Sequence, residues 1–563
     1  MLRTRRVSTC LFGILMSLFV TALAQSQESN SPAPPALATT SPAAPTAPGL
    51  PAAAQAGPRK PSPTPVSPFE QGLVAFHVQN FQQAAPKFAE AGAPATFQGA
   101  IALAWLARTN LHLHKIEEAE QAARKAIEVA PNSAAAQSAM AEVLFRQANF
   151  TEAEDILKKL VKLQTSEARV YLALSRLYTV TGNYKAAKTC MDLAHKLDEE
   201  DPDIYAEWVD TLPRSERLEE WKKRLANGIY EDERERGYLL SAVTVLEDEA
   251  RQSERSCKLV EKKLPMETKF ESLLVDAKTL RGYGLAVKIN DTSSRLLVDT
   301  GASGILINSK IAEKAGVARV ADQKIAGIGD KGASSGYVGF ASRLQIGNLV
   351  FENCYVDVVD KKNSLGEDGL IGTDVFSDFL VELDFPDVKL RLSELPAYPD
   401  APSASPGLTL GQPEKGNLHN RWIPPQFSDY ERVYRFGHML LIPATINKSA
   451  RKMFLVDTGG WDNFVSPAAA RGNVKIHSDS DITVKGLSGK VDKVYTTDRV
   501  TLTFGHFKQE RYDMVAFDLT DISNDAGTEI SGSLGFAMLY MLDLKIDYRD
   551  HLVDFAYDPN RFH

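Results

Sequence analysis

Two short motifs, far apart in the chain, each place a carboxylic acid directly after an apolar run. Leu296-Leu297-Val298 leads into Asp299-Thr300-Gly301, and Met453-Phe454-Leu455-Val456 leads into Asp457-Thr458-Gly459. An apolar run that ends in a glycine turn is typical of a buried strand. Two such turns can bring Asp299 and Asp457 face to face. Two carboxyl groups that share one proton can act together as general base and general acid.

The surroundings of the two motifs match, and they recur in the same order. Gly369-Leu370-Ile371-Gly372 ends 73 residues after Asp299, and Gly532-Ser533-Leu534-Gly535 ends 78 residues after Asp457. A glycine-containing hairpin lies between each motif and its loop. The recurrence indicates an internal duplication, so this half of the chain is expected to form two β lobes.

These landmarks resemble the aspartic peptidase family, in which each of two β lobes gives one Asp-Thr-Gly turn and one hydrophobic-hydrophobic-glycine loop. The resemblance covers about residues 271–563. The lobe lengths suit the retroviral-type, bacterial form of the fold better than the larger pepsin lobes, although both lobes lie in one chain, as in pepsin. The resemblance implies an aspartic-type endopeptidase that hydrolyses an extended peptide or protein substrate without a metal or another cofactor.

The resemblance also implies a role for each motif residue. Asp299 and Asp457 would form the catalytic dyad, with the assignment of base and acid left open. The supporting residues would be Thr300 and Thr458, which link the lobes by hydrogen bonds, and Gly301 and Gly459, which allow the turns. Two substrate-binding flaps would close over the site, at Gly327, Ile328 and Gly329 and at Gly486 and Leu487.

Two departures from the family pattern bear on the chemistry. Pepsin-like enzymes have Ser or Thr directly after each Asp-Thr-Gly, where this chain has Ala302 and Gly460. Losing a hydrogen bond to the charged carboxylate raises its pKa, which predicts activity at mildly acidic to neutral pH. Trp461 follows in the second lobe and either lines a substrate subsite or packs beside the site. The alternative function is a catalytically inactive peptide-binding or scaffold protein of the cell envelope.

The start of the chain has the pattern of an export signal. Arg3, Arg5 and Arg6 precede an apolar run from Leu11 to Ala24, which ends in an Ala-x-Ala cleavage pattern. We therefore expect a periplasmic or extracellular protein with no membrane span after cleavage, or a membrane-anchored one if the signal stays uncleaved. Residues 25–68 hold 12 of the 29 prolines and predict a disordered tether.

A helical repeat follows the tether. Phe81, Ile116, Phe150 and Tyr184 recur with spacings of 34 or 35 residues, each followed by alanine three positions later. Paired helices with this period resemble a tetratricopeptide array of about four repeats, in which stacked neighbours cover each other's apolar faces. The array is expected to offer a groove to a protein partner or substrate, with a rigid spacer as the alternative.

The predicted fold class is multidomain α + β, an α-solenoid followed by a two-lobed, mostly antiparallel β unit. The predicted segments are a signal peptide (1–24), a tether (25–68), the repeat array (69–227), a helical connector (228–270), lobe 1 (271–395), an interlobe linker (396–429) and lobe 2 (430–563). The net charge of −8 gives no basic field of the kind that binds nucleic acid. Cys190, Cys257 and Cys354 are expected to be mostly buried thiols with at most one disulfide.

Overall fold

A computed structural model describes residues 9–12, 66–230, 232–251, 257–276, 279–329, 332–359, 368–399, 418–478 and 482–561. The predicted signal peptide and tether therefore lie almost wholly outside the described residues. Within that N-terminal stretch, only the strand β1 (Thr9–Phe12) and the few residues from 66 onward are described, and β1 pairs in parallel with β20 (Thr483–Gly486). Most of the predicted interlobe linker also lies outside them.

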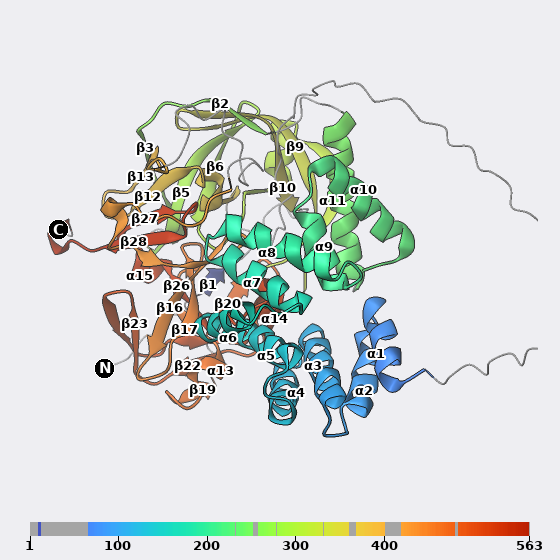
Figure 1. The fold of residues 1–563 in the computed structure, drawn as a ribbon. Coiled ribbons are helices and arrows are strands. Elements are labelled where there is room, and N and C mark those ends of the chain that lie inside the picture. The colour runs from blue at the N-terminus through green and yellow to red at the C-terminus, as the bar shows by residue number, and fades with distance from the viewer. Residues whose placement is uncertain are drawn as a thin grey trace, which may run out of the picture.

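Ten helices in five consecutive pairs occupy residues 68–227, one pair more than the four repeats expected. Their bounds are α1 Pro68–His77, α2 Phe81–Ala91, α3 Phe97–His112, α4 Ile116–Val129, α5 Ala134–Arg146, α6 Phe150–Lys162, α7 Ala168–Val180, α8 Tyr184–Leu197, α9 Pro202–Asp210 and α10 Arg214–Asn227. The array lies against one side of the β unit (Figure 1).

The repeat period of the sequence sets the boundaries of these helices. The four repeat markers Phe81, Ile116, Phe150 and Tyr184 are the first residues of α2, α4, α6 and α8. The alanines three positions later are buried, because a larger side chain there would hold the paired helices apart. Two residues before each marker the backbone adopts a positive φ, from 55° at His114 to 76° at Gly182, which turns the chain between paired helices.

The connector, expected to be helical over 228–270, is helical in its first part only. Helix α11 (Glu233–Arg251) is followed by the strands β2 (Lys258–Glu261) and β3 (Met266–Lys269). β2 pairs with a strand of lobe 1, and β3 closes the edge of a sheet that both lobes share. Hydrogen bonding to these sheets overrides the charged, helix-like composition of the segment.

Lobe 1 is a nine-stranded sheet built mostly from antiparallel pairs. Its main strands are β4 Glu271–Asp276, β5 Thr279–Ile289, β6 Thr292–Asp299, β7 Ile305–Asn308, β8 Ala318–Ile325, β9 Ser334–Ile346, β10 Leu349–Val359 and β11 Gly369–Gly372, with the helix α12 Ser309–Ala315. β11 runs parallel to β6, and its Gly372 is the register partner of Asp299. The hydrophobic-hydrophobic-glycine loop thus lies beside the first Asp-Thr-Gly turn.

Lobe 2 repeats this plan in a ten-stranded sheet. Its elements are β15 Tyr434–Phe436, β16 Met439–Ile446, β17 Lys452–Asp457, β18 Phe464–Val465, α13 Pro467–Ala470, β19 Ile476–Ser478, β22 Tyr495–Thr497, β23 Val500–Phe504, β24 Phe507–Arg511, β25 Val515–Ala516, α14 Thr520–Ala526, β26 Gly532–Gly535 and α15 Phe536–Leu539. β26 runs parallel to β17, and Gly535 is the register partner of Asp457. The same local geometry therefore recurs at the second turn.

A six-stranded sheet contains strands from both lobes. Its order is β14 (Glu431–Arg432), β28 (Leu552–Ala556), β27 (Asp543–Asp547), β12 (Phe379–Asp384), β13 (Lys389–Glu394) and β3. β12 of lobe 1 pairs directly with β27 of lobe 2, and Glu382 faces Lys545 at the middle of the ladder. Buried side chains of both lobes and of this sheet form one continuous apolar core, so the lobes are not independent bodies.

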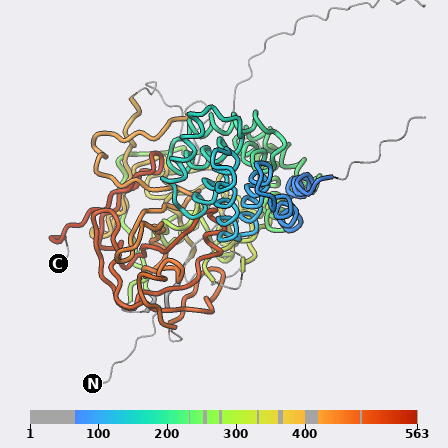
Figure 2. The backbone as a smooth tube through the Cα atoms, turned by 60° about the horizontal axis from the view of Figure 1, so that its bottom comes forward, coloured from blue at the N-terminus to red at the C-terminus, as the bar shows by residue number. Residues whose placement is uncertain are grey.

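The repeat array packs directly on lobe 2. Phe150 lies against Tyr434 and Phe436, with ring centroids 4.4 and 5.8 Å apart. Tyr184 Oη and His551 Nε2 are 2.8 Å apart, and one hydrogen bond joins them. Both array residues begin second helices of their repeats, so the turns within repeats form the docking edge. The backbone tube in Figure 2 shows the same side-by-side arrangement.

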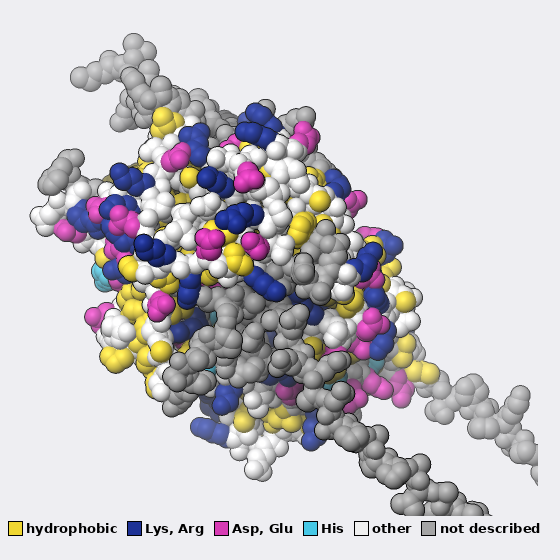
Figure 3. All heavy atoms as spheres, turned by 90° about the horizontal axis from the view of Figure 1, so that it is seen from above, with side chains coloured by type: hydrophobic (Ala, Val, Ile, Leu, Met, Phe, Trp, Pro, Cys, Tyr) yellow, Lys and Arg dark blue, Asp and Glu magenta, His cyan; other side chains and the backbone are white. Residues whose placement is uncertain are grey.

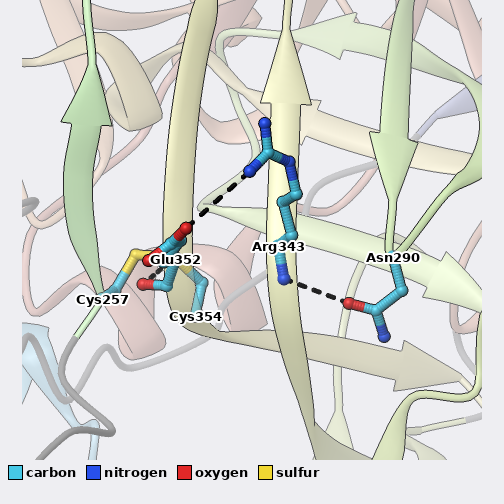
Figure 4. Close-up of a disulfide and its surroundings, with 5 residues drawn as sticks. All are labelled: Cys257, Asn290, Arg343, Glu352 and Cys354. Carbon is cyan, nitrogen blue, oxygen red and sulfur yellow. Dashed lines mark hydrogen bonds and ion pairs between the residues drawn. A yellow bond between two sulfur atoms is a disulfide. The ribbon is translucent and has the colours of Figure 1, made fainter.

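One disulfide joins the start of β2 to β10 of lobe 1. Cys257 and Cys354 are bonded, and they close a loop of 97 residues (Figure 4). The expectation of at most one bridge is confirmed for the cysteines that the structure describes, since Cys190 is a free, partly buried thiol.

On the face shown in Figure 3, basic and acidic side chains are interspersed. In the described ranges, no helix combines the length and apolar character needed to cross a bilayer.

Candidate active site

The two aspartates of the repeated motif lie at the ends of β6 and β17, fully buried where the lobes meet. Asp299 and Asp457 both have 0% of their surface exposed. A Cβ atom on Gly459 would fall well inside van der Waals contact with the Asp299 carboxyl group, and one on Gly301 would lie 3.1 Å from Asp457 Oδ1. Each turn therefore approaches the carboxyl group of the other, and only glycine leaves room for it.

The two threonines lock the turns to one another. The backbone N–H of Thr300 donates to the Thr458 hydroxyl, and the N–H of Thr458 donates to the Thr300 hydroxyl, both at 3.0 Å. The Thr300 hydroxyl donates to the carbonyl of Val456 at 2.7 Å, and the Thr458 hydroxyl donates to that of Val298 at 2.9 Å. This reciprocal set of four bonds fixes the separation and orientation of the two aspartates.

Each carboxylate has its inner oxygen held by backbone N–H groups. Asp299 Oδ1 accepts from Gly301 at 2.8 Å, whereas Asp457 Oδ1 accepts from both Gly459 and Gly460, at 3.0 and 2.9 Å. Beyond the other carboxyl group, neither Oδ2 atom has a hydrogen-bond partner among the described residues. These Oδ2 atoms are the ones that could share a proton and meet a reacting molecule.

Burial raises the pKa of both carboxyl groups, but not equally. The pKa of Asp299 lies well above its ordinary value because of burial and, next, the nearby charge of Asp457. Burial raises the pKa of Asp457 to about 6, and the N–H groups of Gly460 and Gly459 oppose this by stabilising its ionised form. Asp457 accepts one backbone N–H more than Asp299, so hydrogen bonding stabilises the ionised form of Asp457 more than that of Asp299, and the shared proton belongs to the coupled pair.

The two predicted flaps meet each other at their tips. Ser488 N–H donates to the Ile328 carbonyl at 3.0 Å, and Gly327 N–H donates to the Ser488 hydroxyl at 3.0 Å. Ile328 is buried in a cluster formed with lobe 2, and Leu487 is buried among apolar side chains of lobe 1. Each tip thus inserts into the opposite lobe. Gly329 has φ 128° and touches the backbone at Gly489, so a side chain there would push the tips apart.

The positions where the sequence departs from the family pattern have different surroundings. Ala302 packs in the apolar cluster of lobe 1 and brings no side-chain hydroxyl to Asp299. Gly460 supplies its backbone N–H to Asp457 instead, so the predicted loss of a hydrogen bond applies to lobe 1 only. Trp461 packs against Phe536 with ring centroids 5.7 Å apart, which favours the packing role over the subsite role.

Three buried polar residues near the dyad were not singled out by sequence reasoning. His438 Nε2 donates to the Gly301 carbonyl across the lobe boundary at 3.1 Å, because a carbonyl oxygen can only accept, and burial lowers the pKa of the ring. Arg281 on β5 lowers the pKa of Asp299 by its charge. Ser533 on β26 lies close enough to lower the pKa of Asp457. His438 and Arg281 lie outside the repeated landmarks, whereas Ser533 belongs to the Gly532–Gly535 loop, and the fold brings all three close to the dyad.

Comparison with known families agrees with this geometry. Residues 285–375 match the aspartyl protease family, and residues 100–133 and 168–201 match the tetratricopeptide repeat. The chain joins tetratricopeptide repeats to an aspartyl protease domain. The protease match includes the Asp299 turn and ends before lobe 2, whose equivalence rests on the repeated strand order and on the paired turns. A comparison with curated proteins gives no match.

Proposed function

We propose that this protein is an exported aspartic endopeptidase in which Asp299 and Asp457 together activate water. The observation that carries the proposal is the pair of fully buried carboxyl groups, held face to face by the four threonine hydrogen bonds. Structural carboxylates at a domain boundary are usually neutralised by basic partners. Here each is buried against another acid instead, which suits a shared proton and costs stability.

The unequal surroundings of the two aspartates suggest their roles. Asp457 accepts two backbone N–H bonds and Asp299 accepts one, so Asp457 is ionised first as the pH rises. In the proposed reaction, Asp457 removes a proton from water and Asp299 donates its proton to the carbonyl oxygen of the scissile peptide. The water oxygen bonds to the carbonyl carbon and gives a gem-diol. Asp457 then gives the proton it took from water to the amine nitrogen, and Asp299 takes a proton back from a diol hydroxyl as the C–N bond breaks, so the dyad returns to its singly protonated state. The pair titrates together, so activity follows its coupled pKa values.

The flaps suggest an extended polypeptide as the substrate. The tips pair through backbone atoms at Ile328 and Ser488, so a peptide beneath them would meet main-chain donors and acceptors from both lobes. Their apolar tips Ile328 and Leu487 are buried when the flaps meet. Opening the flaps to admit substrate therefore exposes apolar surface, and closing them over substrate excludes water from the dyad.

Export and recruitment by the array complete the proposal. The disulfide Cys257–Cys354 supports export, because such bonds persist mainly in oxidising compartments outside the cytoplasm. We propose a periplasmic or extracellular location, in agreement with the N-terminal signal pattern. The array docks on lobe 2 by the edge that carries Phe150 and Tyr184. Other faces of the array remain for a partner or a substrate.

Cleavage of a peptide library by the full chain tests the proposed function. We expect the wild type to cut peptides between about pH 4 and pH 7, with inhibition by a pepstatin-like compound. Asp299→Asn and Asp457→Asn should each abolish cleavage, whereas Asp558→Asn, an exposed aspartate near the C-terminus, should leave it unchanged. Absence of cleavage by the folded wild type over this range would favour the alternative, a peptide-binding protein without catalysis.

A further inference from the structure

A cavity lies beside the flaps, and neither aspartate of the dyad lines it. Its volume is about 1320 Å³, and residues from the connector helix α11, from β8 to β10, from both flap tips and from the α14 region line it. The flap residues Ile328, Gly329 and Ser488 belong to its wall, whereas neither Asp-Thr-Gly turn does. We call this space the flap chamber. A molecule inside it would touch both flap tips without touching the aspartates.

Three separate parts of the molecule enclose the flap chamber. α11 packs against β8, and a Tyr355 hydroxyl bond of 2.9 Å to Asp248 ties the same helix to β10. Arg234 at the start of α11 forms an ion pair with Asp525 of α14 in lobe 2. The connector therefore bridges lobe 1 and lobe 2, and the chamber is formed only where the helical connector and both lobes come together.

One wall of the chamber is the edge of a sheet. β8 is the last strand of the lobe 1 sheet, and it pairs with β9 alone among the described strands. The outward backbone groups of an edge strand can pair with an added extended chain. Residues Asp322 to Ile325 of this strand line the chamber. A polypeptide in an extended conformation is the ligand that this wall fits best.

The charge of the chamber selects the kind of polypeptide. Eight acidic side chains line it against three basic ones. The basic residue Arg234 is already paired with Asp525, and Arg319 is paired with Asp322. Asp232, Asp518 and Asp521 are exposed, and no described basic side chain lies within ion-pair distance of them. The lining thus leaves negative charge for a ligand to neutralise.

We propose that the flap chamber binds a basic, extended segment of the protein substrate at a distance from the bond to be cleaved. The volume exceeds the roughly 300–1,000 Å³ typical of small-molecule sites, which favours a polypeptide segment. The substrate role rests on the proposed protease function, but binding of a basic segment does not. A bound segment would hold the substrate next to the flap tips. Another segment of the same substrate could then reach the two aspartates when the flaps open.

Binding to a non-cleaving protein tests this site directly. The probe is a short fluorescein-labelled peptide of alternating lysine and valine, and a glutamate–valine peptide is the counter-probe. The full chain carrying Asp299→Asn should bind the lysine probe and not the glutamate probe, as followed by fluorescence anisotropy. Adding Asp232→Asn, Asp518→Asn and Asp521→Asn should weaken binding about tenfold, because the loss of about 1.4 kcal/mol to which this corresponds is shared by three exposed ion pairs that are individually weak.

A matched triple variant separates local from general charge effects. Asp291→Asn, Asp429→Asn and Asp558→Asn remove the same charge from exposed positions outside the chamber, and they should leave the affinity unchanged. Hydrogen exchange of the Asp299→Asn chain gives a second readout, with protection of β8 expected when the lysine probe binds. Equal affinity of both triple variants, equal affinity for the two probes, or unchanged exchange in β8 would each overturn the proposal.

The same experiments keep the site distinct from the proposed activity. If the wild type cleaves peptides but the lysine probe does not bind in the chamber, the basic-segment site is refuted and the protease function stands. If the probe binds as described but nothing is cleaved, the basic-segment site stands and the protease function fails. In an active wild type, the chamber variants should raise KM for a lysine-tailed substrate and leave kcat for the untailed one unchanged.

Discussion

Replacing Asp457 by asparagine should stabilise the protein at neutral pH while it removes the proposed base. Asparagine has nearly the same shape, and its Oδ1 atom can still accept the N–H groups of Gly459 and Gly460. What the substitution removes is an ionisable group that is fully buried and faces another acid. Ionising this buried group costs the folded state free energy. The size of that cost sets how much Asp457→Asn should raise the free energy of unfolding.

The magnitude follows from the pKa of Asp457. Burial raises it from 3.8 to about 6, a difference of 6 − 3.8 = 2.2 pH units. At 1.36 kcal/mol per unit, ionised Asp457 destabilises the folded state by about 3 kcal/mol. Because the folded pKa is the higher one, the cost is absent below the unfolded pKa and is fully present above the folded pKa. Asp457→Asn should therefore gain about 3 kcal/mol near pH 7.5 and almost nothing near pH 3.5.

Urea unfolding followed by tryptophan fluorescence measures this difference at the two pH values. Asp429→Asn, an exposed change at the end of the interlobe linker, serves as the control and should shift the unfolding free energy by less than about 0.5 kcal/mol at either pH. The decisive quantity is the pH dependence of the stabilisation. A change of the same size at both pH values, or a loss of stability at neutral pH alone, would refute the account of Asp457 as a buried acid with a raised pKa.

Three further changes test other parts of the site. Gly459→Ala should lower kcat by about a hundredfold or more, because its methyl group would displace the Asp299 carboxyl; the far-UV circular dichroism should not change. Thr300→Val should lower the unfolding free energy in urea by about 2–4 kcal/mol, since two buried backbone groups lose their partner, and Thr300→Ser should restore most of it. Reducing Cys257–Cys354 should cost about 4 kcal/mol, seen as a lower Tm with reductant, and equal melting with and without reductant would contradict it.

Much of the candidate site could be predicted from the sequence because its elements are local and duplicated. An apolar run followed by Asp-Thr-Gly specifies a buried strand and a turn, and the second copy supports the first. The glycines Gly372 and Gly535, identified only by their spacing, prove to be the register partners of the two aspartates. The starts of the array helices could be predicted for the same reason, because the pattern is local and repeated and each repeat marker is the first residue of a helix.

The remaining features depend on contacts between segments far apart in the chain. His438 reaches the Gly301 carbonyl from a turn 137 residues away, and nothing in its neighbours signals that role. Residues 258–261 have a charged composition that suits a helix, yet pairing with β10 makes them a strand. The contact of Phe150 with Phe436 could not be predicted from the sequence either. An aromatic residue at the start of a repeat helix is also explained by packing within the array.

The shared six-stranded sheet joins two lobes that are encoded separately within one chain. Their sequences can therefore change independently, which the sequences of two identical chains in a dimer cannot do. Because β12 and β27 join the lobes permanently, each lobe can acquire its own substitutions without losing its counterpart. Such divergence is visible around the dyad, where Ser533 occupies the position that Leu370 holds in the other lobe. Duplication and fusion thus allow the symmetry of the pair to break, so that each aspartate can specialise in one direction of proton transfer.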